Sequence, residues 1–113
     1  MKPILCVGAA SWDVVLGVDA FPAHPTKVLA QRCVETAAGM ASAAAMTICS
    51  LGGRAGVLAR VGDDEHGARW LEGMRKAGVD THLVEQLPGA RTALSAIIVD
   101  AGGDRLVGVR ARS

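Results

Sequence analysis

The sequence predicts an α/β fold in which a parallel α/β layer carries a small antiparallel β-sheet. Hydrophobic residues make up 50% of the 113 residues but aromatic residues only 3%, so small and aliphatic side chains must fill the core, as in closely packed α/β layers. Short apolar runs that end at glycine alternate with helical patterns, and two pairs of strands follow one another without a helix between them. The length allows one domain at most.

The parallel layer is expected to hold two main strands, at residues 3–8 and 54–62, because both are apolar runs that end at glycine. A helix of small residues runs between them from the turn Ala38-Gly39 to Gly52, where a helix end favours glycine. A second helix is predicted over residues 62–78, followed by a short strand at 81–85. Its packing face holds residues at helical spacing: Gly67, Trp70, Leu71, Met74 and Ala77.

The antiparallel sheet is predicted from two strand pairs. Residues 14–19 and 28–35 form the first pair, joined by a connection whose prolines exclude a central strand. Residues 92–100 and 105–110 form the second, a hairpin across a glycine-containing turn. We expect the two pairs to join into one four-stranded sheet set apart from the parallel layer.

Charge and cysteine usage exclude several classes of function. The formal net charge is +1, from 12 basic and 11 acidic residues without a run of one sign, so no nucleic-acid partner is expected. The apolar N-terminus is too short for a membrane span, so no membrane partner is expected either. Three cysteines without a CxxC pair indicate a reduced, cytoplasmic setting.

Two single residues carry open alternatives. Asp13 follows the first strand at a distance that suits hydrogen bonds to ligand hydroxyls, but a turn-capping aspartate fits equally well. Lys27 stands at the entrance of the strand predicted at 28–35, either as a solvated edge lysine or as a cation that meets an anionic group on a substrate.

A metal site and a dinucleotide site have little support. Asp63, Asp64 and His66 are explained by capping of the second helix, whose free amides need acceptors. Neither GxGxxG nor GxxxxGK[ST] occurs, which weakens an oxidoreductase interpretation that rests only on the strand-then-glycine start.

Glycines and small residues form a spaced series: Ala38, Gly39, Ala41, Ala45, Gly52 and Gly62. This series resembles the N-terminal signature of the ribokinase-like (PfkB-type) carbohydrate kinases. Further features follow in the family's order: the helix start at 62–67, its exit at 76–80 and the hairpin at 92–110. Segment 9–13, Lys27 and the alanine-rich helix are most similar to the branch that includes sulfofructose kinase.

The resemblance implies the N-terminal portion of a carbohydrate kinase. Its α/β core would take in about residues 1–13 and 36–90, and its β lid, at about 14–35 and 91–112, would close over a sugar or sugar acid and pair with a second subunit's lid. It implies that Asp13 binds sugar hydroxyls and that the Gly39 backbone lies against the sugar. Ala43 stands where the signature usually has asparagine, so one polar contact is missing or comes from elsewhere. The substrate-binding residues implied are Asp13, Lys27, Ala38, Gly39, Met40 and Ala43.

The family's reaction is phosphoryl transfer from ATP, with Mg²⁺ on the nucleotide. The family's C-terminal half, with a GAGD-type turn and a catalytic aspartate, is not in this sequence. The chain is therefore expected to hold no catalytic residue, to bind ATP and Mg²⁺ poorly and to be inactive alone. The alternatives are a non-catalytic oligomerisation or interaction module and, with less support, a nucleotide-binding oxidoreductase domain.

Overall fold

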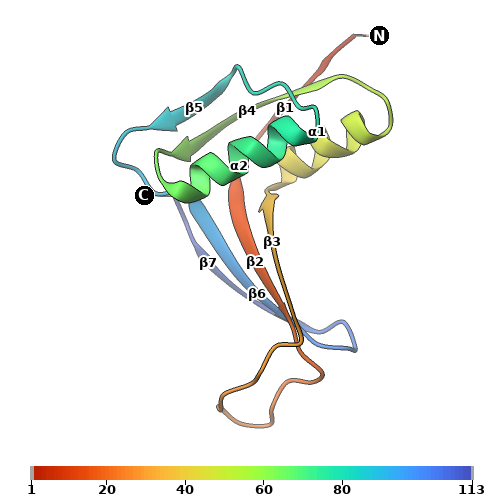
Figure 1. Ribbon diagram of the computed structural model, residues 1–113, viewed down its shortest axis with the longest axis vertical. Coiled ribbons are helices and arrows are strands. Elements are labelled where there is room, and N and C mark those ends of the chain that lie inside the picture. The colour runs from red at the N-terminus through yellow and green to blue at the C-terminus, as the bar shows by residue number, and fades with distance from the viewer. Residues whose placement is uncertain (1, 113) are drawn as a thin grey trace.

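The computed structural model describes residues 2–112 and confirms the α/β class. The elements form two sheets that meet at an angle, with both helices on the first sheet and the second sheet projecting from it (Figure 1). In chain order the elements are β1 (Ile4–Val7), β2 (Ser11–Gly17), β3 (Arg32–Ala38), α1 (Met40–Ser50), β4 (Ala55–Gly62), α2 (Glu65–Lys76), β5 (Val84–Leu87), β6 (Ala93–Val99) and β7 (Arg105–Arg110).

The parallel layer is a three-stranded sheet of order β1-β4-β5, with α1 and α2 on one face. Alternate side chains of β4 point into the core against α2, because successive side chains of a strand face opposite ways. The other face is bare: Leu5 is 50% exposed, Val7 65% and Leu58 40%. The core on the helix side includes Ala55, Val57, Ala59, Val61, Trp70, Leu71 and Met74.

Helix α2 confirms the predicted packing face, since Gly67, Trp70, Leu71 and Met74 are buried. The capping interpretation is confirmed for Asp64, because the Gly67 N–H donates to Asp64 Oδ1 at 2.9 Å. Asp63 instead accepts from the loop amide of Gly89 at 3.0 Å. No helix within residues 2–112 is long and apolar enough to cross a bilayer.

The second sheet, which we call the lid, has the order β3-β2-β6-β7. Both predicted antiparallel pairs are present, β2 with β3 and β6 with β7, and they do join into one sheet. The joint between β2 and β6 is parallel, however, so the lid is mixed rather than wholly antiparallel. Between the two pairs the chain passes through α1, β4, α2 and β5 of the parallel layer, and both β2 and β6 leave that layer in the same direction.

Three strands are shifted from their predicted positions. β2 begins at Ser11 rather than residue 14, and β3 spans Arg32–Ala38 rather than 28–35. β5 spans Val84–Leu87 rather than 81–85. As a result the lid sheet takes in residues 11–13 and 36–38, and the connection between β2 and β3 occupies residues 18–31 at the far end of the lid (Figure 1).

Candidate functional site

An open groove of about 790 Å³ lies where the two sheets meet. Its base is the segment 8–11 between β1 and β2, and its walls are the bare face of the parallel sheet and the inner face of the lid. Leu58, Arg60 and Glu85 line the first wall, and Ala93, Ser95 and Val109 line the second. Grooves of this size suit a small-molecule ligand.

Four polar side chains share the inner face of the lid close to the groove's base, and we call them the polar row. In the register of the sheet, Asp13 lies opposite Thr36 on β3 and Ser95 on β6. The Ser11 hydroxyl donates to Asp13 Oδ1 at 3.1 Å. Trp12, between them, points the opposite way into the core and is 8% exposed. The polar row therefore consists of Ser11, Asp13, Thr36 and Ser95.

Asp13 occupies a different structural context from the one expected. It lies within β2 rather than in a loop after the first strand, so the turn-capping alternative does not apply. It is half-buried, and its carboxylate has the Ser11 hydroxyl as a partner. Such a group can accept hydrogen bonds from ligand hydroxyls at the mouth of the groove.

The turn Ala38-Gly39 is packed against the base of the same groove. Gly39 has φ 113° and ψ 147°, a conformation that glycine alone adopts without strain. A Cβ atom at this position would lie 2.2 Å from the carbonyl oxygen of Ala9. On the other side of the turn, Trp70 Nε1 donates to the carbonyl oxygen of Ala38 at 3.2 Å.

The first turn of α1 follows directly, and one side of it is exposed while Ala41 and Ser42 are buried. No side chain caps this helix end, so its first backbone N–H groups have no side-chain acceptor. Met40 is 91% exposed, and Ala43 is exposed one turn further on. Four residues that the resemblance implies thus lie close together at the C-terminal end of β3, near Thr36 of the polar row: Ala38, Gly39, Met40 and Ala43.

The structure does not bring Lys27 to these residues. The expectation that it stands at the entrance of a strand is wrong, because β3 begins only at Arg32. Lys27 lies exposed in the connection 18–31, at the opposite end of β2 and β3 from Gly39. The prolines of this connection keep it out of the sheet.

The sequence did not point to Ser11, Thr36 or Ser95. Each is a single hydroxyl in a strand, and only the register of three strands shows that they face Asp13. The alternation of Ser11, Trp12 and Asp13 was the one available signal, because it places two polar side chains on one face.

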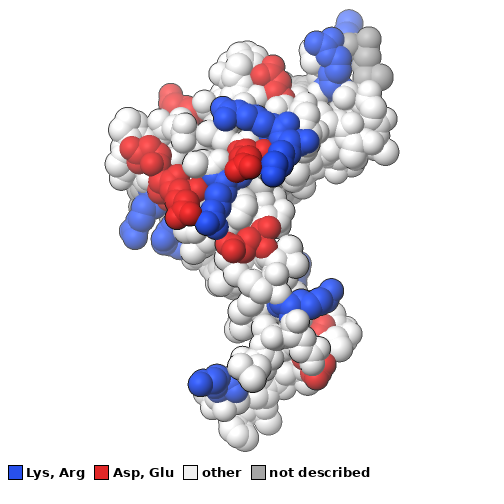
Figure 2. Space-filling model, in the orientation of Figure 1, with Lys and Arg blue, Asp and Glu red and all other residues white. Residues whose placement is uncertain are grey.

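The charged groups near the site are paired or dispersed. Arg60 and Glu85 form an ion pair at 3.3 Å on the wall of the groove. Figure 2 shows acidic and basic side chains intermixed over the face that carries α2, with few charges along the middle of the lid. A single-sign patch that would attract a polyanion is absent from this view.

The surroundings of Asp64, the residue that caps α2, shift its pKa. Partial burial pushes its pKa up, but hydrogen bonds from the hydroxyl and amide of Thr92 and from the amide of Gly67 outweigh that effect. They hold the pKa of Asp64 below its ordinary value of 3.8.

Residues 2–112 do not bring together three or more His, Cys, Asp or Glu side chains that could hold a metal ion. The same residues carry no glycine-rich phosphate loop of the kind that cradles a nucleotide.

A parallel α/β layer with a projecting four-stranded lid defines the ribokinase-like fold. The chain matches the crystal structure of an Agrobacterium tumefaciens protein described as a ribokinase, with TM-score 0.94 and 43% identity, over 98% of this chain and 36% of that one. It also matches a ribokinase from Cryptococcus neoformans in complex with ADP, with TM-score 0.83 and 20% identity, over 99% of this chain and 35% of that one.

The chain belongs to the pfkB family of carbohydrate kinases, whose profile matches residues 1–111. It is 30% identical over 104 residues to an ATP-dependent ribose-1-phosphate kinase of Halopiger xanaduensis and 26% identical over 110 residues to the ribokinase of Bacillus subtilis. These matches take in 92% and 97% of this chain, which spans only 35% and 38% of those proteins. The oxidoreductase interpretation rested only on a strand followed by glycine at the start of the chain. That start lies within the region that matches the pfkB family, so it no longer favours an oxidoreductase.

Proposed function

We propose that this chain is the sugar-binding and lid part of an ATP-dependent carbohydrate kinase. Two observations carry the proposal, in a chain of the pfkB family. Ser11 and Ser95 of the polar row line the groove, with Asp13 and Thr36 beside them in the sheet register. The Ala38-Gly39 turn packs against Ala9 at the groove's base. The parent reaction would transfer a phosphoryl group from ATP to a hydroxyl of a sugar or sugar acid.

The polar row supplies the hydrogen bonds that a sugar requires. The Asp13 carboxylate accepts from sugar hydroxyls, and the hydroxyls of Thr36 and Ser95 can both donate and accept. Gly39 lets the sugar approach the backbone closely, and the uncapped amides of α1 face the same end of the lid. Ala43 offers no polar contact there, so the polar row takes over the role that an asparagine would have.

The relatives narrow the substrate only to a class. Those named above are a ribose-1-phosphate kinase and a ribokinase, which favours a pentose or pentose phosphate. Resemblance to the sulfofructose kinase branch favours a sulfonated ketose instead. Both kinds of sugar carry adjacent hydroxyls that Asp13 could bind. A binding screen with both decides which of them is the substrate.

We propose that the chain is inactive alone. Phosphoryl transfer needs a cradle for the γ-phosphate and a base beside the attacking hydroxyl. When bound, ATP with Mg²⁺ supplies the phosphoryl group. In relatives nearly three times as long, residues beyond the matched region are available to hold the nucleotide. The contribution of this chain is to bind the sugar and shield it from water.

The proposal also includes three further expectations: pairing of this lid with the lid of a second subunit, a cytoplasmic setting, and a role for Lys27. Val34 and Val107 are 54% and 45% exposed on the lid, which favours contact with a second lid. Lys27 is too far along the lid to join the polar row in this conformation, so its role remains a prediction from the resemblance.

Calorimetric titration of the chain with ribose, ribose 1-phosphate, fructose and a sulfonated ketohexose tests sugar binding. We expect one of these to bind, and Asp13→Asn to weaken its binding about tenfold or more, since a hydrogen bond to a charged group contributes about 1.5–3 kcal/mol. Asp19→Asn is the matched control, because Asp19 is an exposed carboxylate at the far end of β2. Equal effects of the two substitutions would contradict the assignment.

The bare face of the parallel sheet favours a second candidate, a non-catalytic interaction module. Parallel sheets are normally covered on both faces, yet Leu5, Val7 and Leu58 are exposed here. A module of this kind would bind a protein partner through that face and ignore sugars. Absence of binding to every sugar in the screen, together with a stable protein complex, would favour it over the kinase.

A further inference from the structure

The start of α2 is tied to the lid by hydrogen bonds around Thr92, the residue directly before β6. Thr92 is fully buried, with 0% exposure. Its hydroxyl donates to Asp64 Oδ1 at 2.6 Å and accepts from the Gly62 N–H at 3.0 Å. Its own N–H donates to Asp64 Oδ2 at 2.9 Å. Both oxygens of Asp64 are therefore engaged with the residue that leads into the lid's second half.

The same carboxylate belongs to α2, because Asp64 caps the helix at the Gly67 N–H. The backbones are in close contact here, since a Cβ atom on Gly62 would lie 2.2 Å from the carbonyl oxygen of Ala90. Arg110, at the end of β7, donates to the carbonyl oxygen of Thr92 at 2.9 Å. The roots of β6 and β7 thus meet at one residue, held by the first turn of α2.

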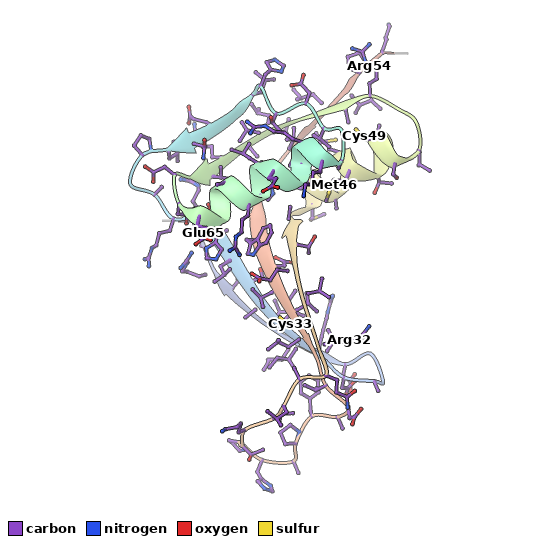
Figure 3. The ribbon with its side chains drawn as sticks, viewed as in Figure 1. Arg32, Cys33, Met46, Cys49, Arg54 and Glu65 are labelled. Atoms are coloured by element: carbon purple, nitrogen blue, oxygen red, sulfur yellow. The ribbon has the colours of Figure 1, made fainter. Side chains whose placement is uncertain are left out.

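Helix α2 also holds the root of the lid's first half. Trp70 donates to the carbonyl oxygen of Ala38, at the end of β3. Arg69 lies 3.6 Å from Glu35, which also accepts from Trp12 Nε1 on β2 at 3.0 Å. In Figure 3, Glu65 marks the start of α2 at the lid root, and Cys33 lies further out along β3.

We propose that Asp64 and Thr92 are positioning residues that set the angle between the lid and the parallel sheet, with α2 as the rigid mount. Capping the helix requires only one hydrogen bond to Asp64 Oδ1. Here Oδ1 also accepts from the Thr92 hydroxyl, and Oδ2 accepts from the Thr92 N–H. Hydrogen bonds to a carboxylate are strong, and Thr92 itself is fully buried. The angle fixes the distance between the two walls of the groove, so these residues act on any ligand without touching it.

Pulsed electron-spin distance measurements on the 113-residue chain test this inference without a sugar. The labelled chain is diluted with an excess of unlabelled chain, so that only distances within one molecule are measured. One spin label is placed on Cys33, which is exposed on the lid, and one on Ala68→Cys, exposed on α2. Cys6 and Cys49 are replaced by alanine in all samples. Thr92→Val keeps the side-chain shape and removes the hydroxyl, whereas Thr92→Ser keeps the hydroxyl. Asp64→Asn keeps a helix cap but turns an N–H₂ group toward the Thr92 amide.

We expect a single narrow distance distribution in the parent and in Thr92→Ser, and a broader, shifted distribution in Thr92→Val and Asp64→Asn. Asp63→Asn is the matched control, because the neighbouring Asp63 accepts from a loop amide, that of Gly89 at 3.0 Å, rather than from Thr92. Parent-like distributions in folded Thr92→Val and Asp64→Asn would overturn the inference, as would equal broadening in Asp63→Asn. If Thr92→Val does not fold, Asp64→Asn, checked by circular dichroism, decides.

Discussion

Gly39 is the residue at which backbone conformation and site geometry meet. Its positive φ and its contact with Ala9 both exclude a side chain. We expect Gly39→Ala to lower the free energy of unfolding by about 3 kcal/mol or more, from strain and steric overlap combined. Gly52 is the matched control: it has φ 89°, but a Cβ atom there would meet no other atom within 4 Å, so Gly52→Ala should cost about 1 kcal/mol. Urea unfolding of both variants measures the difference, and equal losses would contradict the close packing at Gly39.

Asp64 makes stability depend on pH in a defined direction. Its pKa is lowered in the folded state, so the unfolded chain binds the proton more readily. The resulting stabilisation is fully present above the ordinary pKa of 3.8 and is lost as the pH falls through the lower folded value. We expect the parent to have a higher free energy of unfolding than Asp64→Asn at neutral pH. This difference should disappear as the pH falls below the lowered folded pKa of Asp64. A gap that stays constant in acid would contradict the hydrogen-bonding account of Asp64.

Only part of the site could be predicted at this scale. Asp13 and Gly39 are accessible to prediction, because a carboxylate after an apolar run that ends at glycine and a glycine before a small-residue helix are local signals. Thr36 and Ser95 are not, since their facing depends on pairing between strands far apart in the sequence. Lys27 is misplaced by the sequence pattern, which predicts the start of β3 too early.

At the scale of elements, local patterns predict the helices better than the strands. The acidic start, apolar face and basic end of α2 lie within its own sequence. The ends of β2 and β3 depend on tertiary contacts instead: Trp12 packs against the core and draws β2 back to Ser11. The parallel joint of β2 and β6 depends on the path through the whole parallel layer, which no local pattern encodes.

Helix α2 should influence the site through Trp70. Trp70→Phe keeps a buried aromatic ring but removes the hydrogen bond to the Ala38 carbonyl, so we expect a loss of stability of about 1–2 kcal/mol and weaker sugar binding. Trp12→Phe is the control, because it removes a hydrogen bond to Glu35 without touching the turn. Urea unfolding measures the stability of each variant, and calorimetric titration measures its affinity for the sugar. Unchanged sugar affinity in Trp70→Phe would show that α2 does not position the turn.

For the whole molecule, two apolar surfaces stand out, the lid and the bare face of the parallel sheet. We expect the isolated chain to self-associate through the lid, because exposed apolar surface on a sheet favours pairing. In sedimentation experiments Val34→Lys should shift the chain toward monomer, while Leu58→Lys on the bare sheet face should have little effect. A stable monomer at micromolar concentration would contradict this expectation. Dissociation by Leu58→Lys alone would identify the sheet face as the contact instead.

The central claim is that this chain supplies the sugar site of a two-part kinase, and a chimera tests it most directly. Residues 1–113 replace the matching part of the Agrobacterium tumefaciens protein, to which this chain is 43% identical over 98% of this chain and 36% of that one. The kcat/KM for ATP-dependent phosphorylation of ribose and of the sugar selected by titration is then measured, with and without Asp13→Asn. We predict an active chimera, a loss of about tenfold or more in Asp13→Asn, and no turnover by the 113-residue chain alone. A folded chimera that phosphorylates neither sugar, or one indifferent to Asp13→Asn, would contradict the account.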